Sequence, residues 1–370
     1  MQPVVRNRAE PLIQRSDRAG AAIAGARTVT RDHRRWLVWN DNAVTRYRLI
    51  SHLLVLGYLF AVGFAAQSGH GRYILFPGLA AIAYELITRP WGRWSSERWR
   101  LVAAPALAAC IGTLVSSVFS YNVMSVLLDM TLCFSLLLAL RADISPAMPA
   151  GFLPLALGMS TWWYPASVAI SMVLLICLSV LWRRYQQKRC STNNQNAPSA
   201  GRIRDLPVPR PAGLLFFALF GLLMAVGVEL SGTRLILFPP LIALAFEMLL
   251  FPDRCPWTDR PVALTAACAL CALGGGLAVR FIGQGAIAAA AAGAFGMLVL
   301  LALRIHVPPA LTVGLLPGLI GARGFEFPVA VIVGTAALCA VFHLGRAWLT
   351  APRNPEQDRL PRSAWCPTRN

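Results

Sequence analysis

Long apolar runs alternate with short polar connections from about residue 49 onward. The first set of runs covers about 49–69, 74–88, 101–120, 122–140, 144–161 and 164–182, and the second covers about 211–231, 235–251, 261–281, 284–303, 307–321 and 328–346. A helix of roughly 20 apolar residues is long enough to cross the hydrocarbon core of a bilayer. The pattern therefore predicts an all-α polytopic membrane protein with about six membrane segments in each set.

Polar stretches divide the chain into five parts. We assign an Arg-rich polar tail to 1–48, a transmembrane repeat to 49–185, a basic polar linker to 186–210, a second transmembrane repeat to 211–347, and a polar tail to 348–370. The first 48 residues contain no apolar core of the kind that a signal peptide needs. Both tails and the linker are therefore expected in the cytoplasm.

The two sets of runs share sequence motifs at a nearly constant spacing, which indicates an internal duplication. The shared positions are the run Ile74-Leu75-Phe76-Pro77 with Ile236-Leu237-Phe238-Pro239, Glu85 with Glu247, Leu140-Arg141 with Leu303-Arg304, Pro146 with Pro309, Gly151 with Gly314, and Gly158 with Gly321.

The composition excludes a water-soluble domain. Hydrophobic residues make up 56% of the chain and charged residues 14%, and the mean hydropathy is +0.57. A soluble domain has about 25% charged residues. The net charge of +18 arises from 34 Lys and Arg against 16 Asp and Glu. No basic helix with interleaved aromatic residues is present, so we expect no nucleic acid partner.

The positions of the arginines predict the orientation, because cytoplasmic connections retain basic residues. If all six runs of each repeat cross the bilayer, most of the basic residues lie inside, in the tails and in 89–100, 183–210 and 252–260. The alternative makes the two proline-bearing runs of each repeat re-entrant and moves basic residues outside. We favour six crossings, which give parallel repeats related by a pseudo-two-fold axis, both termini in the cytoplasm, and the inner membrane of a bacterium as the location.

The proline- and glycine-rich runs are the first candidate for a binding site. A proline inside a membrane segment leaves a carbonyl that lipid cannot satisfy, so the segment must face protein or a water-filled cavity. A helix that begins at a proline pair also presents free N–H groups to an anion. We therefore name a candidate substrate site, while a purely structural role for the same residues stays open: Arg141, Arg304, Pro146, Pro308, Pro309, Gly151, Gly314 and His306.

Three acidic residues inside the runs are candidates for proton coupling. A charged carboxylate at the centre of a span costs about 2.5–3.5 kcal/mol on insertion scales, so each needs a partner or a role. We expect Glu85 and Glu247 to pair with the arginine of their own repeat, Arg141 or Arg304, at the inner edge of the membrane. Asp129 lies in the middle of its run and has no acidic counterpart in the second repeat.

Cysteines and small residues indicate packing. Cys268 and Cys271 form a CxxC on an apolar run without nearby histidines, which favours helix packing over a metal site. The stretches Gly274-Gly275-Gly276 and 286–293 predict close approach between helices. We expect no metal, cofactor or catalytic set, and hence no enzyme; an intramembrane enzyme would need Asp129, His306 and Glu247 to converge.

The proline motif resembles that of the HPP family of integral membrane proteins. The resemblance rests on His306-Val307-Pro308-Pro309-Ala310 with Gly314 and Pro317, and on Phe238-Pro239-Pro240. It covers each repeat, so the chain resembles two fused copies. A valine separates His306 from the prolines, and the first copy has Asp143 in place of the histidine. Some plastid and cyanobacterial members of that family are implicated in nitrite transport, so the resemblance implies a small inorganic anion as substrate.

Two classes of function follow from these observations. The first is a membrane transporter or channel that passes a small solute, such as an inorganic anion, between the two repeats. The second is a membrane scaffold or sensor that does not transport and whose Arg-rich tails contact a partner. The lipid bilayer is a partner in both cases, and assembly into a homo-oligomer is compatible with both.

Overall fold

The computed structural model describes residues 41–67, 74–76, 78–92, 94, 98–190, 209–255 and 257–350. Most of the predicted tails and linker, and Pro77 of the first repeated motif, lie outside these residues. The chain divides after Ser51 into two units. The described residues of the first unit belong to the beginning of helix α2 (Asp41–Ala65), and the second unit contains all the other helices.

The described residues form helices and the turns between them, without a β-strand. Within this part of the chain, seven helices are long and apolar enough to cross a membrane. This confirms the prediction of an all-helical protein whose spans fit a multi-pass membrane protein. The long helices are α2, α4 (Arg98–Val118), α7 (Trp163–Cys190), α8 (Pro211–Ser231), α10 (Pro261–Ile282), α11 (Ala286–Leu303) and α13 (Glu326–Leu349).

Shorter apolar helices alternate with the long ones. They are α3 (Gly78–Thr88), α5 (Val123–Ala139), α6 (Ala147–Leu157), α9 (Pro239–Ala245) with its π-helical continuation η3 (Phe246–Leu250), and α12 (Pro308–Ile320); single 3-10 turns form η2 (Arg234–Leu237) and η4 (Pro252–Arg254). At 1.5 Å per residue, a helix of 11 residues such as α6 is about 16 Å long. By itself it covers about half of a hydrocarbon core of about 30 Å.

Two helices extend beyond the apolar runs that predicted them. Helix α2 begins at Asp41, inside the range that we assigned to the N-terminal tail, and α7 continues to Cys190, inside the range assigned to the linker. Hydropathy marks only the apolar part of a helix. Arginine and glutamine favour helix as well as most apolar residues do, so the helix continues past the apolar boundary.

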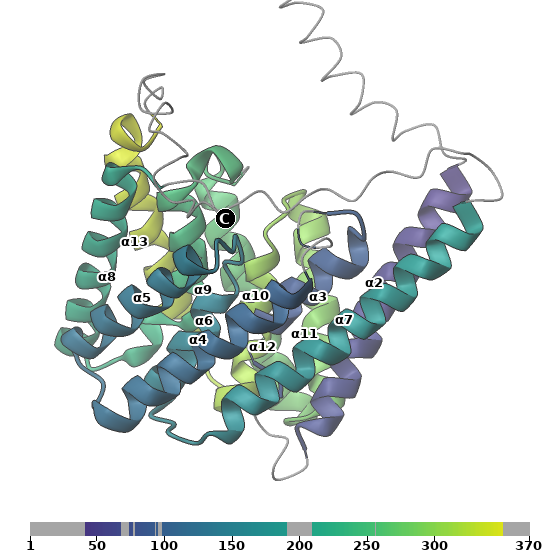
Figure 1. Cartoon of the computed structure of the whole chain (residues 1–370), viewed down its shortest axis with the longest axis horizontal. Helices are drawn as coiled ribbons and strands as arrows, with labels where there is room; N and C mark the ends of the chain where they lie inside the picture. Colours follow the sequence, from purple (N-terminus) through teal and green to yellow (C-terminus); the bar gives the residue numbers. More distant parts are fainter. Residues whose placement is uncertain are drawn as a thin grey trace, which may run out of the picture. The chain divides into compact units, whose positions relative to one another are not determined.

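The shortest helices form the core of the second unit. Every residue from Ala147 to Leu155 of α6 and from Pro308 to Pro317 of α12 is buried, and so is all of α9. The long helices instead expose large apolar side chains, such as Leu230 at 85% and Phe281 at 79%. Figure 1 shows α6, α9 and α12 among the longer helices of this unit. The proline-bearing segments are therefore covered by protein, as a backbone with unpaired carbonyls in a bilayer requires.

Helix α6 follows Pro146 and helix α12 begins at Pro308; we call these two the proline-led helices. Each is packed closely against a long helix through a pair of glycines. A Cβ atom added to Gly112 of α4 would lie 1.6 Å from the carbonyl oxygen of Gly151 in α6. A Cβ atom on Gly275 of α10 would lie 1.9 Å from the carbonyl oxygen of Gly314 in α12. These backbones touch only because side chains are absent. The predicted close approach at the 274–276 glycines is thus confirmed at Gly275.

The short helices also connect the two sequence halves. Helix α3 packs on α12, and α6 packs on α9, so each proline-led helix contacts a short helix from the other half of the sequence. A Cβ atom on Gly78, at the start of α3, would lie 2.7 Å from the carbonyl oxygen of Pro146, at the start of α6. The beginnings of α3 and α6 are therefore adjacent in the core.

Candidate functional site

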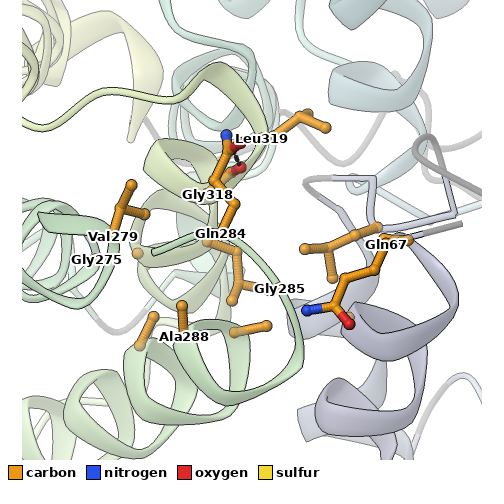
Figure 2. A pocket seen from close by; sticks show the side chains of 15 residues that line it. Gln67, Gly275, Val279, Gln284, Gly285, Ala288, Gly318 and Leu319 are labelled. Atoms are coloured by element: carbon orange, nitrogen blue, oxygen red, sulfur yellow. Dashed lines mark hydrogen bonds between the residues drawn. The ribbon is translucent and has the colours of Figure 1, made fainter. Parts of the chain in front are cut away.

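A cavity of about 330 Å³ lies between the end of α2 and helices α10, α11 and α12. Its wall is made mainly of glycine and alanine, and the polar side chains in it are those of Gln67 and Gln284. Figure 2 shows Gln67 across the cavity from Gly318 and Val279. The described lining residues are all uncharged, so the cavity offers amide groups and backbone carbonyls to a small polar molecule.

Both glutamines are held against glycine backbone. The Nε2 atom of Gln284 donates to the carbonyl oxygen of Gly318 at 2.9 Å. A Cβ atom on Gly285 would lie 1.9 Å from Nε2 of Gln67, and Gly285 has a φ of 133°, which side chains rarely adopt. The turn before α11 therefore needs glycine for Gln67 to approach.

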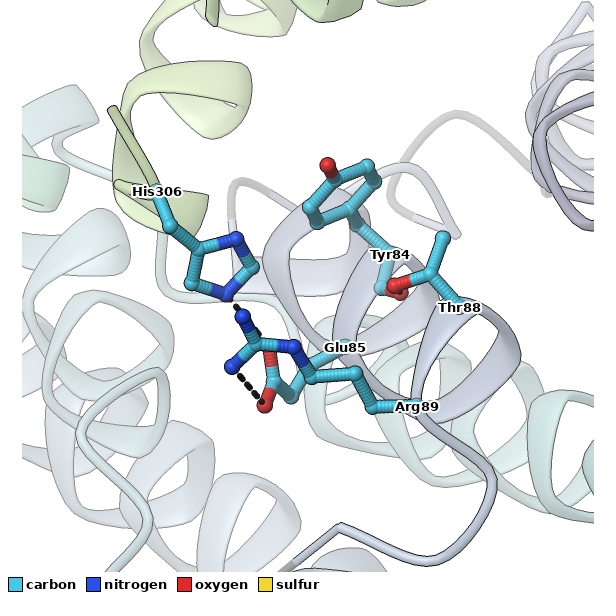
Figure 3. Close-up of polar contacts among 5 residues, drawn as sticks. All are labelled: Tyr84, Glu85, Thr88, Arg89 and His306. Atoms are coloured by element: carbon cyan, nitrogen blue, oxygen red, sulfur yellow. Dashed lines mark hydrogen bonds and ion pairs between the residues drawn. The ribbon is translucent and has the colours of Figure 1, made fainter. Parts of the chain in front are cut away.

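At the start of α12, His306 contacts an acid from the other half of the sequence. His306 Nε2 lies 2.9 Å from Oε2 of Glu85 in α3, and Arg89 approaches Oε1 of the same carboxylate at 3.5 Å. Figure 3 shows both side chains reaching Glu85. The ring of Tyr84 lies 5.6 Å from the imidazole, centroid to centroid. The Glu85 side chain is only 12% exposed, so this pair is largely shielded from solvent.

Glu247 makes the corresponding contact on the other side of the core. Ser145, just before α6, donates from its hydroxyl to Oε1 of Glu247 in the π-helical turn η3. Glu247 is 8% exposed and Ser145 is 1% exposed. Each acid thus meets a residue that precedes the proline-led helix of the opposite half.

These contacts overturn the expected pairing of each acid with the arginine of its own repeat. Among the ion pairs of the described residues, none joins Arg141 or Arg304 to Glu85 or Glu247, and both arginines are exposed. The expectation was wrong because the short helices pack across the halves. Depth in the membrane, which the sequence indicates, does not reveal the lateral neighbour.

The two arginines share an unusual backbone conformation. Arg141 has a φ of 49° and Arg304 a φ of 51°, and they are the non-glycine residues with positive φ in the described chain. Each follows a helix whose end is closed by a bond from the next residue: Ala142 N–H to Leu137 O, and Ile305 N–H to Leu300 O. Glycine usually occupies this position. A cation here also interacts favourably with the negative end of the helix dipole.

Asp129 lies in α5 and is 1% exposed. The sulfur of the Cys133 thiol lies 3.9 Å from Oδ1 of Asp129. The Oδ2 atom has no hydrogen-bond partner among the described residues. The structure therefore places this acid in the protein interior rather than at a lipid-facing surface.

The structure brings only some of the candidate residues together. Gly314 lines the cavity, and His306 joins Glu85, whereas Arg141, Arg304, Pro146 and Gly151 are not among the cavity residues. The hydrogen bonds of the described residues do not join Asp129, His306 and Glu247 to one another. Sequence reasoning missed Gln67 and Gln284, whose signal was weak, because each lies at the boundary of an apolar run, where polar residues are common.

Comparison with protein-family models, with curated proteins and with solved structures finds no match for this chain.

Proposed function

We propose that this integral membrane protein transports a small polar solute and that it is built from two parallel six-segment repeats. The cavity between α2 and α10–α12 carries the proposal, because substrate sites in transporters lie between repeats, beside interrupted helices. Gln67 belongs to the first half of the sequence, and the rest of the wall is mostly from the second.

Three observations support the two-repeat architecture. The order of long and short helices from α2 to α7 recurs from α8 to α13. The exception is α5, which has 17 residues and is counted as short, whereas its counterpart α11 has 18 and is counted as long. Arg141 and Arg304 adopt the same left-handed conformation after α5 and α11. The contact of Gly112 with Gly151 recurs as that of Gly275 with Gly314.

We favour six crossings for each repeat. The segment from Ala142 to Gly158 combines a non-helical stretch with the short helix α6. The helix alone is about 16 Å long, so in a crossing the non-helical residues 142–144 and the turn at Ser145 and Pro146 supply the rest of the path. In this orientation both termini lie in the cytoplasm of a bacterial cell. Gln67 and Gln284, which follow α2 and α10, are then on the opposite side of the membrane, and we propose that the cavity opens there.

The solute that we propose is small and binds through hydrogen bonds. An amide donates from nitrogen and accepts at oxygen, so Gln67 and Gln284 suit either a neutral polar molecule or a small oxyanion. Nitrite is the first solute to test, because the resemblance to the HPP family implies a small inorganic anion. We include membership of that family in the proposal.

Uptake by purified protein in lipid vesicles tests the function. We expect uptake of nitrite, or of another small polar solute in a panel, above that of protein-free vesicles. Gly318→Leu adds bulk inside the cavity and should abolish this uptake. Gly227→Leu is the matched control, because Gly227 has no heavy atom within 4 Å of an added Cβ atom and lies outside the cavity.

The outcomes separate the possibilities. Uptake that Gly318→Leu removes and Gly227→Leu retains supports transport through this cavity. If both variants retain the uptake of the wild type, the transport path lies outside this cavity. No uptake of any solute by correctly inserted protein contradicts transport and favours a scaffold or sensor.

A further inference from the structure

Asp129 is a buried acid without a basic partner among the residues that the structure describes. It is 1% exposed, and the hydrogen bonds and ion pairs of the described residues include no cation at its carboxylate. Burying a charged carboxylate without a partner costs several kcal/mol, whereas a neutral carboxylic acid is far easier to bury. An ion pair therefore does not explain why an acid occupies this buried position.

The helices packed on α5 carry few titratable groups. Helix α6 has none in its sequence, and α8 carries Glu229, which accepts the N–H of Val123 at the beginning of α5. Helix α4 carries Arg98 and Arg100 in its first turn, and Cys110 nearer its middle. Among the described residues, the titratable groups that interact with the acid are the Cys133 thiol on α5 itself and the Tyr164 hydroxyl on α7.

Neither of these two groups compensates a charge on Asp129. The Tyr164 hydroxyl donates its proton to the carbonyl oxygen of Ala150 at 2.7 Å. The thiol of Cys133 is a weak donor at 3.9 Å, held in place against Gly151, where an added Cβ atom would lie 2.3 Å from the sulfur. The carboxyl group thus has one free oxygen in a closely packed, enclosed site.

The position of Asp129 in the proposed repeat is informative. It corresponds to Ala292, which lines the cavity, at the same spacing that relates Gly112 to Gly275 and Gly151 to Gly314. In the first half this place is filled: Val126, Phe152 and Leu155, which correspond to Ala289, Leu315 and Gly318 of the cavity wall, are all at most 1% exposed. Asp129 therefore lies among larger side chains than those around its counterpart Ala292 in the cavity wall.

We propose that Asp129 is a proton-binding site and that the proton it binds is coupled to solute transport. The second part of this inference rests on the proposed function. In this arrangement, the solute site is lined mainly by the second half, with Gln67 from the first half, and the proton site lies within the first half. The two sites communicate through the contacts of α3 with α12 and of α6 with α9, which join the halves.

Infrared spectroscopy tests proton binding without reference to transport. Protein in lipid nanodiscs should show the carbonyl absorption of a neutral carboxylic acid that Asp129→Asn removes. Asp253→Asn is the matched control, because Asp253 is an acid whose side chain is 70% exposed, and it should leave the band unchanged. If Asp129→Asn does not insert, Asp129→Glu should shift the band. Spectra of wild type and Asp129→Asn that coincide from acidic to alkaline pH would overturn the proposal.

Vesicle uptake tests the coupling. A pH gradient should drive uptake of nitrite, or of whichever solute in the panel is transported, by wild type. In Asp129→Asn this stimulation should be lost, while exchange of labelled solute at equal concentrations persists. A wild type that transports solute but ignores the gradient overturns the coupling. A wild type that shows the band but transports no solute contradicts the proposed function and leaves proton binding supported.

Discussion

At the scale of single residues, Arg304 and Arg141 are the positions where the sequence opposes local backbone preference. A left-handed conformation costs a non-glycine residue about 1–2 kcal/mol, and both arginines adopt it. The arginine side chain at the end of a helix offsets part of this through the helix dipole. The same locally unfavourable choice at both positions is the observation that a role for the guanidinium group would explain.

Replacing Arg304 by glycine or by alanine separates backbone strain from charge. Both variants lack the guanidinium group, but glycine adopts a φ of about 50° without strain. We expect Arg304→Gly to be more stable than Arg304→Ala by about 1 kcal/mol. Thermal unfolding in detergent measures the difference, and an alanine variant as stable as the glycine variant would contradict the strain.

The sequence singled out Glu85 and Glu247 but not the partners of their side chains. Duplication made Glu85 and Glu247 stand out, and both are buried or nearly so at the centre of polar contacts. Their partners, His306 and Ser145, come from the opposite half, more than a hundred positions away in each case. A one-dimensional pattern gives the depth of a residue in a membrane, but the partner depends on which helices are adjacent.

At the scale of helices, hydropathy predicted the segments closely. Helix α8 (Pro211–Ser231) has the predicted bounds, and α12 (Pro308–Ile320) differs from its run by one residue at each end. Prolines account for this accuracy, because proline at the first position of a helix defines where the helix begins. Pattern alone did not show that α6, α9 and α12 are the innermost helices, since apolar side chains suit lipid and protein interior equally.

The glycine contacts between α4 and α6 and between α10 and α12 predict a large effect for a single methyl group. Gly275→Ala places a Cβ atom 1.9 Å from the Gly314 carbonyl oxygen, which forces the helices apart. Overpacking of this kind costs about 1–3 kcal/mol. We expect Gly275→Ala and Gly112→Ala to lower the unfolding temperature in detergent.

The control for these variants is Gly227→Ala in α8, where an added Cβ atom has no neighbour within 4 Å. This change should leave stability equal or slightly higher, because alanine favours helix over glycine by about 1 kcal/mol. Equal unfolding temperatures for Gly275→Ala and Gly227→Ala would show that the helices are not in backbone contact.

At the scale of the whole molecule, the central feature is an asymmetry between two similar halves. In the second half, small residues such as Ala289 and Gly318 line the cavity, while the larger Val126 and Leu155 occupy the corresponding positions in the first half. The shared motifs in the sequence predict a duplication, but they do not predict this difference. A cavity arises where neighbouring helices from distant parts of the chain all carry small side chains, and no single run shows that.

The most direct measurement is the accessibility of cysteines placed at equivalent positions of the two halves. In a background without native cysteines, Leu315→Cys and Gly318→Cys should react with a membrane-impermeant thiol reagent added from the side opposite the cytoplasm. Phe152→Cys and Leu155→Cys should resist the reagent from both sides. Equal reactivity of the two pairs, or reaction of the first pair only from the cytoplasmic side, would contradict a single cavity that opens away from the cytoplasm.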